Sequence, residues 1–83
     1  MQNILLPRVQ RAFQRAFGVE PGAVGVDTEP DDIPQWDSLG HTTLAFALER
    51  EFDISFDIDE LMELENVREI LRVVADKLGT TVA

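Results

Sequence analysis

The residues best suited to chemistry lie in one short stretch, where Asp37, Ser38 and His41 fall within five positions. A serine, a histidine and an acid are the side chains of a hydrolytic triad. Ser38 and His41 can face the same way on a helix, but Asp37 precedes that helix and would have to orient the imidazole from the wrong side. The chain has no second histidine. We therefore expect no enzyme activity here, and expect His41 to be a partly exposed helix residue.

Calcium is the next chemistry to consider, because oxygen-bearing side chains occupy alternate positions over residues 53–59, as in an EF-hand loop. The sixth position of that loop is Ile58, where the sharp turn requires glycine. The twelfth is Leu64, where a bidentate glutamate is required. A loop that starts at Asp27 fails at the same two positions. The sequence therefore predicts no dedicated metal site.

Ser38 alone offers a different chemistry. A serine at the first turn of a helix places its hydroxyl beside free backbone N–H groups and the positive end of the helix dipole, where a phosphate ester is favourably placed. The position suits phosphorylation or any phosphate-linked group. The alternative is that Ser38 is only a helix-start residue, since serine is also common there for its capping ability.

The elements that must position these residues are helical. Apolar residues recur at three- and four-residue steps over about 5–17, 38–52 and 67–78, and acid-rich capping patterns predict a shorter helix over about 58–64. Asp37 is the natural N-cap of the second helix. No alternating pattern long enough for a strand competes with these periods. We expect an all-α fold, an antiparallel four-helix bundle with three longer helices and one short one.

Residues 18–37 form a long loop between the first two helices. They hold three of the five glycines, three of the four prolines and six acids, with no basic residue. A loop of that length in a compact domain either carries function or packs its apolar residues. Those apolar residues are Val19, Val24, Val26, Ile33 and Trp36.

Length and composition limit the function classes. At 83 residues the chain has room for a single domain, which we assign to residues 1–83, and for one modest core. The absence of cysteine removes disulfides and thiolate sites. No apolar run approaches the ~20 residues of a membrane span, and the first residues lack the pattern of a signal peptide. We expect a soluble, cytoplasmic monomer without membrane insertion.

Charge indicates the partners. Sixteen acids against seven bases give a net charge of −9, which repels nucleic acid and favours basic protein surfaces. The acids are concentrated in the run Glu49–Glu65, which has eight of them against one base, Arg50. The run is either a solvated face or a docking surface.

Two sequences carry a more specific signal. Trp36–His41 reads WDSLGH and Leu44–Ile54 reads LAFALEREFDI. Together they resemble the phosphopantetheine attachment region of acyl carrier proteins. The resemblance covers nearly the whole chain, because Phe17–Val19 lies at the usual distance before the motif and Asn66 opens the last helix where that family opens it.

The resemblance implies a non-catalytic carrier with 4'-phosphopantetheine as its covalent cofactor. Ser38 would receive that group from coenzyme A through a magnesium-dependent phosphopantetheinyl transferase, and the thiol of the arm would hold an acyl group as a thioester. Asp37 and Leu39 would flank the attachment site. The residues expected to contact partner enzymes are Phe46, Glu49, Glu51 and Asp57, and the expected lining of an acyl pocket is Leu44, Leu48, Phe52, Phe56, Leu61 and Leu64.

Departures from the family pattern refine this hypothesis. Gly40, Thr43 and Arg50 stand where fatty-acid carriers often have acids, whereas Trp36 and His41 resemble specialised stand-alone carriers of secondary metabolism. We expect the partners to be acyl-loading and synthase-type enzymes of fatty-acid or polyketide-type biosynthesis, with basic docking surfaces. The alternatives are a peptidyl or aminoacyl carrier of nonribosomal synthesis and an acidic helical adaptor without a prosthetic group.

Overall fold

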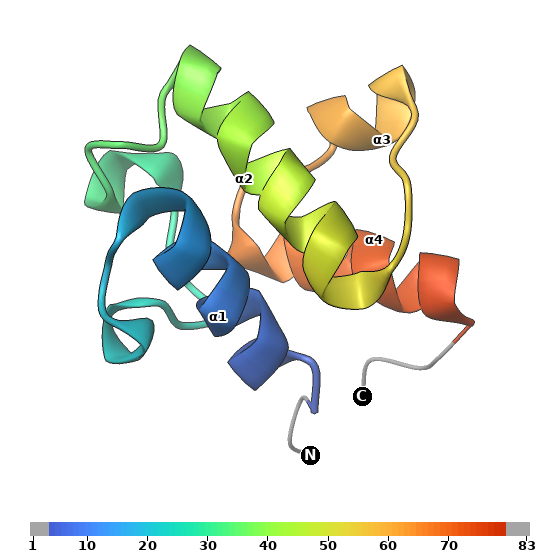
Figure 1. Cartoon of the computed structure of the whole chain (residues 1–83), viewed down its shortest axis with the longest axis horizontal. Coiled ribbons are helices and arrows are strands. Elements are labelled where there is room, and N and C mark those ends of the chain that lie inside the picture. Colours follow the sequence, from blue (N-terminus) through green and yellow to red (C-terminus); the bar gives the residue numbers. More distant parts are fainter. Residues whose placement is uncertain (1–3, 80–83) are drawn as a thin grey trace.

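The predicted order of helices is confirmed in the computed structural model, which describes residues 4–79 (Figure 1). Within these residues the α-helices are α1 (Leu6–Phe17), α2 (Ser38–Phe52), α3 (Ile58–Met62) and α4 (Val67–Leu78), and there is no strand. The loop between α1 and α2 contains two short 3-10 helices, η1 (Pro21–Ala23) and η2 (Pro30–Asp32). In the described part of the chain, no helix has the length and apolar character needed to cross a bilayer.

The helix ends follow from capping residues near them in sequence. Pro7 lies in the first turn of α1, where its missing N–H has no helical partner to lose. The side chain of Asn66 accepts a hydrogen bond from the backbone N–H of Glu69 at 2.8 Å and so starts α4. Asp57 and Glu60 form a reciprocal capping box that starts α3.

The end of α3 differs from the prediction. The helix ends at Met62 rather than near residue 64, because the backbone tightens there into i to i+3 hydrogen bonds. The N–H of Glu63 donates to the carbonyl of Glu60 at 3.0 Å, and the N–H of Leu64 donates to that of Leu61. This turn directs Leu64 into the core, where it is fully buried.

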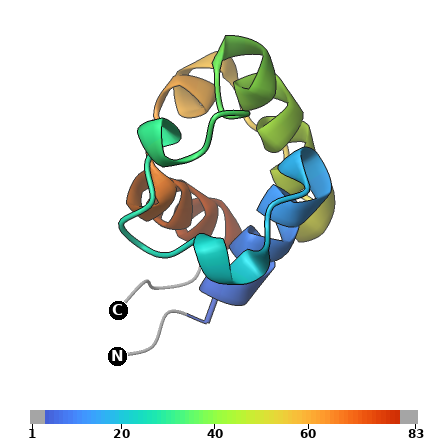
Figure 2. The same ribbon diagram turned by 90° about the vertical axis from the view of Figure 1, so that its left-hand side faces the viewer.

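The core lies among α1, α2 and α4, which surround it from different sides (Figures 1 and 2). α1 and α4 contribute the apolar faces that their periodicity predicts, and the loop closes the remaining side. α2 contributes Leu44, Leu48 and Phe52, but not Leu39 or Phe46, which its periodicity also placed on the apolar face. No residue of α3 is fully buried. The largest side chains that are fully buried are Phe13, Leu44, Leu48, Leu64 and Ile70.

The long loop packs its apolar residues against this core, which is one of the two roles that its length predicts. Val24, Ile33 and Trp36 are buried, and Val19 and Val26 are half-buried. Polar contacts hold the loop as well, since the N–H of Val67 donates to the carbonyl of Thr28 at 3.0 Å. The loop therefore presents the segment before Ser38 in a fixed position.

Candidate functional site

Ser38 is the first residue of α2, and its side chain is exposed at the start of that helix. Asp37 caps the helix, and its Oδ1 accepts a hydrogen bond from the backbone N–H of Gly40 at 2.8 Å. The Ser38 hydroxyl makes no hydrogen bond to any residue of the described range 4–79. A modifying protein can therefore reach this oxygen, which lies at the positive end of the α2 dipole.

A hollow of about 610 Å³ opens beside Ser38. It lies where the last part of the long loop meets the chain between α3 and α4. Its wall combines apolar, acidic and neutral polar side chains, which are Pro30, Trp36, Asp37, Ser38, His41, Met62, Leu64 and Glu65. This setting has room for a phosphate ester on Ser38 and for an arm that leads away from it.

The imidazole of His41 bonds to residues other than Ser38 and joins the long loop, α2 and α3. The indole N–H of Trp36 donates to Nδ1 of His41 at 3.0 Å, and the two rings lie nearly parallel, at 7°. Because Nδ1 accepts, Nε2 carries the proton and donates to the carbonyl of Leu61 in α3 at 2.9 Å. His41 is half-buried, as expected of a partly exposed residue. Its bridging role was not predicted.

These contacts separate the three residues of the hypothetical triad. Both ring nitrogens of His41 have partners other than Ser38, and the Asp37 carboxylate binds the helix backbone. The nucleophile–base–acid relay that hydrolysis requires is therefore absent from this arrangement.

The predicted acyl-pocket residues belong to the core. Leu44, Leu48 and Leu64 are fully buried and Phe52 is nearly so, whereas Phe56 and Leu61 are half-buried and pack against them. This is also the arrangement of ordinary core residues, which is the second way to interpret their apolar pattern. Of the six, only Leu64 also lines the hollow beside Ser38. A role in sheltering an acyl chain stays a prediction.

Phe46, predicted to contact partners, and Leu39, predicted to flank the attachment site, are both exposed on α2. Leu39 is 83% exposed and Phe46 is 61% exposed, although the helical period of α2 also placed them on or beside its apolar stripe. They lie seven positions apart, which is two turns, so both project from one side of the helix. Exposed apolar residues that share a helix face are typical of a docking surface.

The acidic residues predicted to face partners are placed less freely. The Glu49 carboxylate accepts a hydrogen bond from the backbone N–H of Phe56 at 2.7 Å, which ties the end of α2 to the segment before α3. Asp57 is exposed, and its Oδ1 caps α3 through the N–H of Glu60. Both carboxylates are therefore partly committed to local structure.

The prediction for Glu51 is wrong. Its side chain is only 7% exposed and faces α1, where Oε2 pairs with Arg8 at 3.3 Å and with Arg11 at 3.0 Å. Arg8 also lies over the ring of Phe52, with its guanidinium carbon 4.5 Å from the centroid. Glu51 holds α1 to α2 and is not available to a partner.

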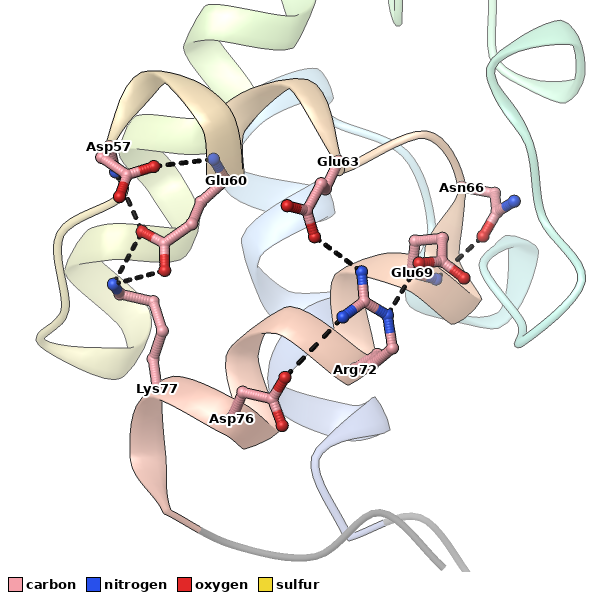
Figure 3. A network of polar contacts seen from close by, with 8 residues as sticks. All are labelled: Asp57, Glu60, Glu63, Asn66, Glu69, Arg72, Asp76 and Lys77. Atoms are coloured by element: carbon pink, nitrogen blue, oxygen red, sulfur yellow. Dashed lines mark hydrogen bonds and ion pairs between the residues drawn. The ribbon is translucent and has the colours of Figure 1, made fainter.

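The acidic surface around α3 is tied to α4 by a network of ion pairs (Figure 3). Lys77 Nζ contacts Glu60 at 2.8 Å, and this hydrogen bond, together with the N–H of Asp57, lowers the pKa of Glu60 below its ordinary value. Arg72 binds Glu63 and Glu69, both at 2.8 Å, and these bonds raise the pKa of its guanidinium. The network fixes the position of α3 relative to α4.

The acidic run does not form a metal site among residues 4–79. No group of three or more histidine, cysteine, aspartate or glutamate residues in this part of the chain could hold a metal ion. Asp53 ends α2 in a left-handed conformation, with φ 55°, and Asp57 starts α3. The alternate acids of residues 53–59 thus serve at helix ends.

Comparisons with known proteins agree with this geometry. A family model described as "Phosphopantetheine attachment site" matches residues 7–74. An acyl carrier protein of Cyanidium caldarium is 29% identical over 75 residues, which cover 90% of this chain and 87% of that protein. The solution NMR structure of a holo acyl carrier protein from Geobacter metallireducens has a TM-score of 0.78 and 32% identity, over 89% of this chain and 85% of that one.

Proposed function

The chain belongs to the acyl carrier proteins, the family with a phosphopantetheine attachment site, and from that premise we propose that Ser38 is the residue that holds the group. The cofactor of the chain is a covalently attached 4'-phosphopantetheine. One observation supports Ser38 above all: it is exposed at the start of α2, beside a hollow, and its hydroxyl has no hydrogen-bond partner among residues 4–79. Asp37 and Leu39 flank it.

The cofactor supplies a terminal thiol, which this cysteine-free chain lacks. The protein itself positions the serine, through the Asp37 cap and the loop that ends in Trp36. Acyl carrier proteins carry intermediates and do not catalyse reactions, and the separation of Asp37, Ser38 and His41 into different contacts agrees with that role.

The proposed task is to carry acyl thioesters among the synthase-type enzymes of fatty-acid or polyketide-type biosynthesis, as a specialised stand-alone carrier. A phosphopantetheinyl transferase and synthase enzymes are the general partners of this family. The chain would act as a single-domain monomer in the cytoplasm with them. Exposed Leu39 and Phe46 supply apolar contacts, and acids around α3 attract basic partner surfaces.

Intact mass measurement tests the assignment. The purified apo-protein is incubated with coenzyme A, magnesium and a broad-specificity phosphopantetheinyl transferase. The expected product carries one phosphopantetheine, and Ser38→Ala carries none. Ser55→Ala, which changes the other serine of the chain, should be loaded like the wild type. A chain that gains no mass would be an adaptor without a prosthetic group, and a gain that survives Ser38→Ala would move the attachment to another residue.

The cargo is tested on the loaded protein. Acyl-loading and aminoacyl-loading enzymes are offered separately, and the arm is examined for the thioester formed. We expect acyl groups to be accepted. Exclusive loading with amino acids would instead identify a peptidyl carrier.

A further inference from the structure

The sequence at the end of α2 predicts an acidic surface, but the structure exposes a basic residue there. In the run Glu49–Glu51, both acids are engaged: Glu49 binds the N–H of Phe56, and Glu51 is enclosed by α1. Arg50, between them, is exposed and makes no ion pair or hydrogen bond through its side chain within residues 4–79. At the end of α2 an unpaired positive charge, that of Arg50, therefore faces solvent.

Arg15 is the second basic residue whose side chain makes no ion pair or hydrogen bond within residues 4–79, and it lies near Arg50. A hollow of about 360 Å³ between α1 and α2 is lined by Arg15, Ala16, Thr43, Ala47 and Arg50. The chain has seven basic residues, all inside the described range, and the other five are each in an ion pair. The two unpaired ones thus share one hollow on a protein of net charge −9.

Helix dipoles account for part of this arrangement. Arg15 lies in the last turn of α1 and Arg50 in the last turn of α2, where a positive charge is favourable. That effect helps two like charges to stay near each other. It leaves their N–H donors without acceptors, and a guanidinium presents five donors in a fork that matches a carboxylate.

We propose that this hollow docks a carboxylate side chain of a partner enzyme. The inference rests on the proposed carrier function, because it describes how α2 meets its partners. Leu39, Thr43, Phe46 and Arg50 follow one another at steps of four, three and four, so the hollow continues the exposed face of α2 that carries Leu39 and Phe46. The small side chains of Ala16 and Ala47 let an incoming group approach closely.

Charge complementarity gives this surface a specificity. The acidic side chains around α3 attract basic residues of a partner, whereas the hollow between α1 and α2 requires an acidic residue of that partner. A partner whose docking surface is uniformly basic would place a positive charge against Arg15 and Arg50, and like charges in contact are costly. A matching partner combines an apolar patch, bases toward α3 and an aspartate or glutamate toward the hollow.

The test uses a defined probe on the full chain. The ¹⁵N-labelled protein is titrated at low salt with a blocked peptide of alternating alanine and glutamate, and in parallel with the same peptide carrying glutamine. We expect saturable shifts of the Ala16, Thr43 and Ala47 amides with the glutamate peptide alone. In Arg15→Gln/Arg50→Gln the affinity should fall about tenfold or more, as loss of charge-assisted hydrogen bonds predicts.

Arg68→Gln is the matched control, because Arg68 is exposed but already paired with Asp27 at 2.6 Å. It should bind the glutamate peptide like the wild type. Three results would overturn the proposal. The amide shifts could be equal with the two peptides, they could persist in Arg15→Gln/Arg50→Gln, or they could occur near every arginine of the chain. Inorganic phosphate is titrated as well, and saturable shifts with phosphate but not with the peptide would overturn it in favour of a small-anion site.

Loading of Ser38 separates this inference from the function on which it rests. Arg15→Gln/Arg50→Gln should still gain phosphopantetheine. If the wild-type protein gains no phosphopantetheine, the carrier assignment fails, whatever the result of the peptide titration. If the wild-type protein gains phosphopantetheine but the glutamate peptide causes no saturable shifts at the hollow, only the docking proposal fails.

Discussion

The carbonyl oxygen of Gln35 lies so close to Gly40 that a Cβ built on the glycine would be 1.8 Å from it. The same Cβ would be 3.1 Å from Cε1 of Phe17. Glycine is a poor helix former, yet here, in the first turn of α2, it allows the long loop to cross the helix next to Ser38. The absence of an acid at this position therefore has a steric cause.

Gly40→Ala should destabilise the protein by about 1–3 kcal/mol, the usual range for overpacking a close contact. The free energy of unfolding is measured by urea titration. Gly22→Ala is the matched control, because a Cβ at Gly22 meets nothing within 4 Å. Gly22→Ala should change the stability by no more than about 0.5 kcal/mol, and equal effects of the two substitutions would refute the steric explanation.

His41→Ala should remove both hydrogen bonds of the Trp36–His41–Leu61 bridge. The indole N–H of Trp36, which is only 4% exposed, would lose its acceptor, at a cost of about 1–3 kcal/mol. Urea unfolding measures this loss, and the fluorescence of Trp36, the one tryptophan of the chain, reports the changed environment. Thr42→Ala, at an exposed neighbouring position, should leave both readouts unchanged. An unaltered emission spectrum in His41→Ala would show that the bridge is not formed in solution.

Glu51→Gln should weaken the junction between α1 and α2. The substitution keeps the size of the side chain but removes the charge that pairs with Arg8 and Arg11, and we expect a loss of about 1–3 kcal/mol. Glu65→Gln, at an exposed glutamate without an ion pair in the described range, is the control. A smaller loss for Glu51→Gln than for Glu65→Gln in urea unfolding would contradict the structural role assigned to Glu51.

The Glu60–Lys77 pair should make the stability depend on pH. The hydrogen bond from Lys77 lowers the pKa of Glu60 in the folded state, so the unfolded state binds its proton first as the pH falls. The stabilisation is therefore present above the ordinary pKa of 4.5 and is lost as the pH falls through the lowered value. Glu60→Gln should unfold with a shallower dependence on pH across this acid range, measured by thermal melting.

Glu20→Gln is the control for this pH experiment, because Glu20 is exposed and its side chain makes no capping bond. Its melting temperature should follow the wild-type pH dependence. If Glu60→Gln also retained the full acid sensitivity, the pair would not contribute to it.

The helices could be predicted from sequence because their causes are local. The helix caps can be recognised from a few neighbouring residues in the sequence. They are Asp37, Asn66 and the capping box of Asp57 and Glu60, and each caps the helix that it was expected to cap. The exposed serine at the start of α2 follows from the same local rules.

What could not be predicted depends on neighbours that are distant in sequence. Whether Glu51 faces solvent is decided by α1, forty positions away, and the same packing leaves Arg50 outside. The partners of His41 lie in the loop and in α3, so a single helical period cannot show them. Gly40 carried a signal that was available, since glycine early in a helix often marks a close approach of backbone.

The contacts that hold α3 on the rest of the protein determine how this helix responds to salt. None of its five residues is fully buried, although Leu61 packs against the core. Its polar links to the rest include Lys77 at Glu60, His41 at Leu61, and Arg72 at Glu63, the residue that follows α3. The two ion pairs weaken as dissolved ions screen them, whereas the neutral hydrogen bond of His41 to Leu61 and the packing of the three longer helices do not. We therefore expect added salt to loosen α3, which carries Met62 beside Ser38, before it loosens the three longer helices.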